Sequence, residues 1–212
     1  MAFKETEMKF SAFFNAMRGH SRNEWLEKAA KLEREALLEW LDTTEEGLFE
    51  RQAEDRLEML SRPGPNGLKA KVLRRDRRHA VPSEIAAIFS VKFGANGPDR
   101  REIGAEKLVP GDVIELVQGE VVPTDVRLLS CDDFHVDQSA FSGNTMPVRK
   151  YAGVGEGKDL HDFPNIALRG MRVVKGRALG VVVAGGPVSA KRAVDSTEFG
   201  NFSAYGFLVP QR

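Results

Sequence analysis

Beyond residue 85 the sequence consists of short β-branched and aromatic runs separated by turn residues. Strand-like runs cover residues 87–93, 112–129, 134–141 and 169–186. The second run predicts two strands around a turn at Gln118 and Gly119, and the last predicts a hairpin broken at Gly176 and Gly180. Short strands with turns every ~8–12 residues are typical of antiparallel folds. This pattern predicts a distorted antiparallel jelly roll or β-sandwich.

The N-terminal part has helical periodicity instead. Ser21 and Glu24 fit a capping box, and apolar residues recur at helical spacing over residues 25–41, which predicts one long helix. Gly47 interrupts this pattern. A second helix follows, with an apolar face formed by Ala53, Leu57 and Leu60. The prolines and glycines of residues 62–67 then predict a turn or linker.

A cluster of basic residues lies at the junction of the two parts, Lys69–Arg78. Its cations are Lys69, Lys71, Arg74, Arg75, Arg77 and Arg78. We predict a solvated linker or helix over residues 67–84. A weak anion-binding patch is the alternative, whether for nucleic acid or acidic lipid. The cluster lacks the interleaved aromatic residues that stack on bases, so nucleic acid is the less favoured partner.

Composition excludes several classes of protein. The 31 basic and 31 acidic residues balance, so net charge gives no reason to expect a nucleic acid or membrane surface. The one cysteine, Cys131, cannot form an intramolecular disulfide and is predicted to be a strand or core residue. No apolar run approaches the roughly 18 residues of a membrane helix. We therefore expect a soluble, cytoplasmic protein.

Four blocks, in the same order as in the family, resemble the actuator domain of P-type cation-transporting ATPases. They cover residues 42–66, 108–129, 136–150 and 169–183. The second block matches the family pattern at Pro110, Gly111, Asp112, Leu116, Gly119, Pro123 and Asp125, with Thr124 in place of the usual alanine. The order of the blocks and the Leu68-Lys69-Ala70 tripeptide are most similar to the magnesium-transporting subfamily.

The resemblance implies a β-rich α+β fold, in which N-terminal helices pack on an actuator-type jelly roll. It divides the chain into four parts. These are an N-terminal helical segment (1–66), a basic linker or helix (67–84), the jelly-roll domain (85–206) and a tail (207–212).

The third block contains the loop Ser142-Gly143-Asn144-Thr145. In the family, the glutamate of this loop positions a water molecule beside an aspartyl phosphate on another domain and takes its proton. Asn144 stands at that position here. A carboxamide is not basic, so the resemblance implies a loop without its catalytic group. We expect Ser142, Gly143, Asn144 and Thr145 to face a partner, and we expect no intact catalytic residue.

The sequence lacks the phosphorylated-aspartate block, the nucleotide domain and the membrane helices of the family. Only Gly67 separates Asn66 from Leu68, where the family has two membrane helices. We expect a silent regulatory or binding module rather than an enzyme. Its partner would be the phosphorylation domain of a P-type ATPase or another protein. Two alternatives stay open: a pump fragment or remnant whose loop assists aspartyl-phosphate hydrolysis, and an acidic-surface or nucleic-acid binder.

No metal or cofactor is expected. The four histidines show no metal-ligand spacing. Asp159, His161 and Asp162 are close enough in sequence to gather a metal ion, but we predict a solvated loop there.

Overall fold

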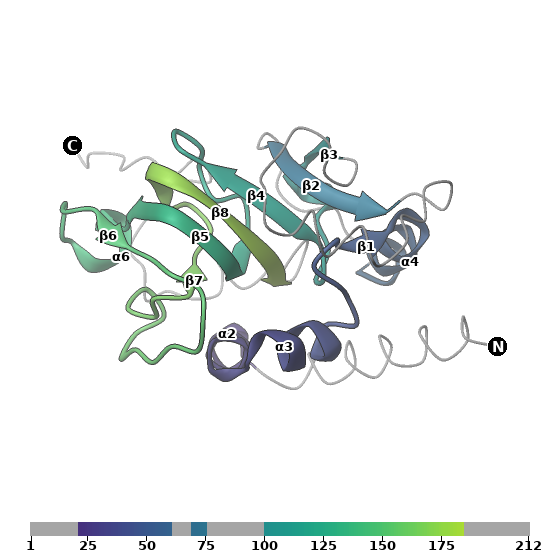
Figure 1. The fold of residues 1–212 in the computed structure, drawn as a ribbon, viewed down its shortest axis with the longest axis horizontal. Coiled ribbons are helices and arrows are strands. Elements are labelled where there is room, and N and C mark those ends of the chain that lie inside the picture. Colours follow the sequence, from purple (N-terminus) through teal and green to yellow (C-terminus); the bar gives the residue numbers. More distant parts are fainter. Residues whose placement is uncertain (1–20, 61–68, 76–99, 185–212) are drawn as a thin grey trace, which may run out of the picture.

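The computed structural model describes residues 21–60, 69–75 and 100–184 (Figure 1). The helical elements are α2 (Arg22–Lys31), α3 (Arg34–Trp40), α4 (Glu50–Leu60), the 3-10 turn η1 (Ala105–Lys107) and α6 (Ser139–Ser142). The strands are β1 (Leu48–Phe49), β2 (Lys69–Arg75), β3 (Arg100–Gly104), β4 (Val113–Val117), β5 (Asp125–Asp137), β6 (Val148–Arg149), β7 (Ile166–Ala167) and β8 (Arg172–Ala184).

The strands form a sheet in the order β1-β2-β4-β8-β5-β6, with β3 paired to β2 and β7 paired to β5. Among the described strands, β1 and β2 pair in parallel and every other pair is antiparallel. The β-rich α+β class is therefore confirmed, while the jelly-roll or sandwich arrangement stays a prediction. The parallel pair departs from the antiparallel prediction because β1 reaches the sheet edge from the N-terminal segment rather than through a hairpin.

The hairpin predicted over residues 169–186 is wrong, because residues 172–184 form one continuous strand, β8. Gly176 does not reverse the chain. Its φ is +74°, and it lies at an irregularity in the β5–β8 pairing, where a Cβ would come 2.3 Å from the carbonyl oxygen of Asp132. The glycine thus permits close approach of two long strands. Residues 134–141 were predicted as a strand, but only residues 134–137 belong to one; α6 begins at Ser139.

The predicted long helix is two helices, α2 and α3. The capping box is confirmed: Ser21 N donates to Glu24 Oε2 at 2.9 Å, and Glu24 N donates to Ser21 Oγ at 3.3 Å. Leu32 ends α2 in an extended conformation. Trp25 of α2 stacks on Trp40 of α3 with ring centroids 4.5 Å apart, so the wide apolar stripe packs the two helices together as well as against the sheet.

Polar side chains of strand β5 hold α2 at both ends. At its start, the Arg22 guanidinium donates two 2.6 Å hydrogen bonds to the carboxylate of Asp125, which is fully buried. At its end, Arg127 donates to the carbonyl oxygens of Ala29 and Leu32. The Arg127 guanidinium thus satisfies carbonyls at the C-terminal end of α2 that the helix itself leaves unpaired.

The basic segment 67–84 is not a linker or helix where the structure describes it, because Lys69–Arg75 form β2. Ala70 and Val72 are buried, whereas Lys69 is exposed and Lys71 is half-buried. Over residues 69–72 this is the two-residue alternation of a strand. The many positive charges made that alternation hard to recognise in the sequence. Residues 76–84 lie outside the described ranges, as does the strand predicted over 87–93. The predicted strands on either side of Gln118 and Gly119 are confirmed as β4 and β5.

Candidate functional site

The loop Ser142–Thr145 leaves the sheet between β5 and β6, at the end opposite α4 (Figure 1). A single helical turn, α6, precedes it. The carbonyl oxygen of Gln138 accepts from the backbone N–H groups of Phe141 and Ser142 and from Ser142 Oγ. Gly143 then ends the turn with φ +71°, a left-handed conformation that glycine adopts without strain. The chain is thus folded so that Asn144 follows a glycine-terminated turn.

Asn144 shapes the loop through its own side chain. Its N–H donates to Ser142 Oγ at 3.2 Å, and its Oδ1 accepts from Met146 N at 3.0 Å. The second bond is the Asx-turn arrangement, in which a side-chain oxygen replaces a backbone acceptor. All residues from Ser142 to Pro147 are exposed, and Met146 retains 68% of its accessible surface. Every predicted loop residue therefore lies together on the surface.

Two polar residues around this loop have no counterpart among the predicted site residues. Gln138 is 5% exposed, and its Oε1 has no hydrogen-bond partner among the described residues. Lys150 is 1% exposed, and its ammonium donates to the carbonyl oxygens of His161 at 2.6 Å and Phe163 at 2.8 Å. Burial lowers the pKa of Lys150 to about 8. Both residues lie in the third sequence block, but nothing in their spacing signals burial.

Arg74, in the middle of the basic cluster that was the alternative anion-binding patch, is engaged inside the protein. Arg74 is buried, and its guanidinium donates to both oxygens of Asp112, each at 2.9 Å, and to Glu50 at 3.2 Å. Lys69 pairs with Glu102 at 2.6 Å. Arg74 is therefore a structural residue and is not available to an external anion. Arg77 and Arg78 lie outside the described ranges, and the side chain of Arg75 is not described.

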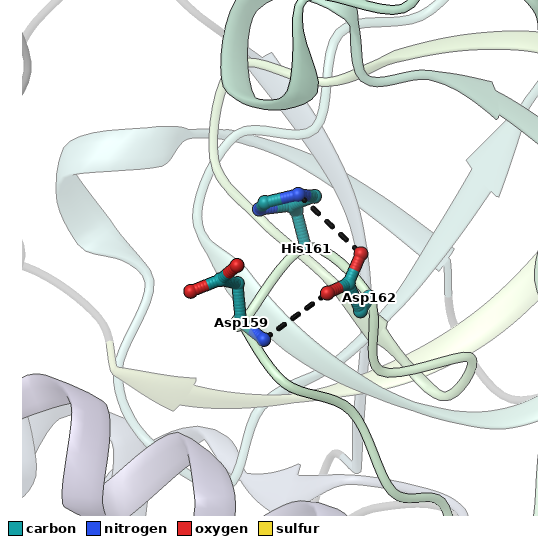
Figure 2. A group of neighbouring side chains, drawn as sticks. All are labelled: Asp159, His161 and Asp162. Atoms are coloured by element: carbon teal, nitrogen blue, oxygen red, sulfur yellow. Dashed lines mark hydrogen bonds and ion pairs between the residues drawn. The ribbon is translucent and has the colours of Figure 1, made fainter.

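A second group of polar side chains lies on the loop between β6 and β7 (Figure 2). Asp159, His161 and Asp162 each offer one ligand atom, and these atoms lie within 4.8 Å of one another. His161 Nε2 is 3.4 Å from Asp162 Oδ1, and Asp159 N donates to Asp162 Oδ2 at 3.1 Å. The sequence predicted a solvated loop at these residues. The structure shows in addition that the three side chains lie close together.

Cys131 lies on strand β5, as predicted from the sequence, and is half-buried. Burial raises the pKa of its thiol to about 11. The thiol is therefore protonated near neutral pH and is a poor nucleophile.

The family model for the P-type ATPase actuator domain matches residues 90–197, just over half of the chain. The magnesium-transporting ATPase, P-type 1, of Salmonella typhimurium LT2 is 32% identical over 114 residues, which are 52% of this chain and 12% of that protein. The probable cation-transporting ATPase F of Mycobacterium tuberculosis H37Rv is 35% identical over 118 residues, 55% of this chain and 11% of that protein.

Among solved structures, a crystal structure of a zinc-transporting PIB-type ATPase in the E2.Pi state aligns with a TM-score of 0.39 and 23% identity. The alignment covers 70% of this chain and 19% of that chain. This chain spans only about one eighth or less of the length of the two curated relatives named above. Among the described residues, no helix combines the length and apolar character needed to cross a membrane. The chain belongs to the P-type ATPase actuator-domain family.

Proposed function

We propose that the chain is a catalytically silent actuator-like module that binds a partner protein through the Ser142–Thr145 loop. The observation that carries this proposal is the position of Asn144, an amide on an exposed, ordered turn where the family pattern has a carboxylate. A turn that matches the family pattern but has no carboxylate to act as a base supports binding rather than catalysis.

The chemistry of Asn144 supports silence in two ways. The amide cannot accept a proton at any useful pH. Its Oδ1 also accepts from Met146 N, so the atom that would orient a water molecule is engaged in shaping the turn. Loss of a general base commonly lowers a rate by about 10²–10⁴-fold. Assisted hydrolysis of an aspartyl phosphate is therefore the less favoured role.

The surroundings of the loop support contact with a protein. Met146 and Tyr151, exposed at 68% and 54%, follow the loop closely along the chain, and Arg149 between them is also exposed. Methionine, tyrosine and arginine are enriched at protein interfaces. A cation beside an uncharged loop suits an acidic or phosphorylated surface. We propose the phosphorylation domain of a cation-transporting P-type ATPase as the partner, with the magnesium-transporting class as the first to test.

Binding of the full chain to the detergent-solubilised magnesium-transporting ATPase of Salmonella typhimurium tests this proposal, with the pump in phosphorylated and unphosphorylated forms. Met146→Ala should weaken binding at least about tenfold if Met146 is a central contact. Val154→Ala is the matched control, since Val154 is also an exposed apolar residue but lies beyond the loop. Absence of binding to either form of the pump, or equal losses in both variants, would contradict the proposal.

A further inference from the structure

We propose that Asp159, His161 and Asp162 form a binding site for a divalent transition-metal ion of the zinc class (Figure 2). Zinc binds histidine nitrogen and carboxylate oxygen at about 2.1 Å, which places neighbouring ligands of a tetrahedral site about 3.4 Å apart. His161 Nε2 and Asp162 Oδ1 already have this separation, 3.4 Å. All three ligand atoms lie within 4.8 Å of one another, close to the spacing that a shared ion requires.

The backbone beneath the three ligands is held from inside the protein. Asp162 N donates to the carbonyl oxygen of Asp159 at 2.9 Å, which closes the turn. The buried ammonium of Lys150 binds the carbonyl oxygens of His161 and Phe163, on either side of Asp162. The ligands therefore project from a supported loop, which limits the conformational freedom lost on metal binding.

The local charge favours a cation. Asp159 and Asp162 are exposed, and within the described part of the chain neither carboxylate forms an ion pair with a lysine or arginine. The buried ammonium of Lys150 interacts with the charge of Asp162, but it donates its hydrogen bonds to backbone carbonyls. Two carboxylates beside an imidazole are a ligand set for zinc, cobalt or nickel ions, whereas magnesium and calcium prefer oxygen alone. Three protein ligands leave a fourth position for water.

A bound ion would tie together a loop that contacts the end of α2 through two of its residues. Gly155 N, earlier in the loop, donates to the carbonyl oxygen of Ala30 at the end of α2. Asn165, at its end, donates to the same oxygen through Nδ2. Because an ion that binds only the folded state stabilises it, zinc should raise the thermal midpoint of the full chain.

Titration calorimetry of the chelator-treated full chain with Zn²⁺ and Mg²⁺ tests the site. The background carries His20→Gln, His79→Gln and His135→Gln, so that His161 is the remaining histidine. We expect one Zn²⁺ per chain, at least tenfold weaker binding after His161→Gln or Asp159→Asn, and much weaker binding of Mg²⁺. Asp133→Asn is the matched control, because Asp133 is an exposed carboxylate that does not belong to the triad.

Unchanged metal-free thermal midpoints would show that the variants fold. Zn²⁺ affinity that survives His161→Gln, equal binding of Mg²⁺ and Zn²⁺, or no Zn²⁺ binding in the background chain would each overturn the proposal. A partner-binding defect in the Ser142–Thr145 loop would leave this result unaffected, because the two tests use different ligands and different residues.

Discussion

Arg74 and Asp112 form a two-point ion pair inside the protein, with Nε–Oδ1 and Nη2–Oδ2 distances of 2.9 Å. Asp112 is fully buried and also accepts from Val109 N at 2.9 Å. The pair fastens β2 to the turn that leads into β4, and Glu50 adds a contact from α4. Through its contact with Glu50, Arg74 also links α4 of the N-terminal segment to the sheet.

Asp112→Asn should lower the free energy of unfolding by about 3–5 kcal/mol, because it leaves the buried Arg74 guanidinium without its main counter-charge. Denaturant titration at unchanged slope measures the loss. Glu102→Gln is the control, since its partner Lys69 is exposed, and it should have little effect. Equal, small losses in both variants would show that the buried pair is not a major source of stability.

Gly111 and Gly119 both have positive φ, +96° and +92°, but differ in their surroundings. A Cβ at Gly111 would lie 2.2 Å from Nη1 of Arg56, whereas a Cβ at Gly119 would meet no atom within 4 Å. Gly119→Ala should therefore cost about 1–2 kcal/mol from backbone strain alone. Gly111→Ala should cost clearly more, because Arg56 must also give up its bonds to the carbonyls of Leu41 and Pro110. Thermal unfolding of both variants compares the two losses.

Arg22→Met should detach the start of α2 from the sheet. It removes two 2.6 Å hydrogen bonds from a fully buried carboxylate, Asp125, which keeps only the N–H of Arg169 as a donor among the described residues. The expected loss is about 3–5 kcal/mol. Arg34→Met is the matched control: its ion pair with Glu45 is half exposed, so at most about 1 kcal/mol should be lost. If both variants unfold at the same denaturant concentration, the attachment of α2 does not depend on Asp125.

Lys150 should make stability depend on pH in the alkaline range. Burial lowers its pKa to about 8 in the folded state from the model-peptide value of 10.5. Between these values the unfolded chain binds more protons, so the free energy of unfolding rises with pH from about 8 to 10.5, and this gain is lost as pH falls through 8. Neutral Lys150 can still donate to the carbonyls of His161 and Phe163.

The difference between the wild type and Lys150→Met isolates this contribution from other titrating groups. We expect the wild type to gain stability relative to the variant between pH 8 and 10.5. A flat difference curve over that range would mean that Lys150 keeps its ordinary pKa in the folded protein.

The sequence predicted what depends on local pattern. The capping box at Ser21, the helix containing Ala53 and the strands around Gly119 are read from spacing within a few residues, and the structure confirms them. The exposed loop at Asn144 followed from glycine and hydroxyl residues in a short block.

What escaped prediction depends on distant partners. The interruption between α2 and α3 coincides with contacts from Arg127, about a hundred positions away, and Arg74 is internal because it meets Asp112. Gly176 looked like a turn, but it accommodates a neighbouring strand. For Asp159, His161 and Asp162, the sequence indicated that they are neighbours, but it did not indicate that Lys150 supports their loop. Contacts between residues far apart in the chain cannot be read from the local periodicity of the sequence.

The central claim is that the loop binds without catalysing, and the decay of a phosphorylated pump tests it most directly. The probe is the Salmonella typhimurium magnesium-transporting ATPase with its own loop glutamate replaced by alanine, so that its aspartyl phosphate persists. Adding the wild-type chain should leave the decay rate unchanged, whereas Asn144→Glu should accelerate it, because a restored carboxylate can take the proton of water. Acceleration by the wild-type chain itself would contradict the claim.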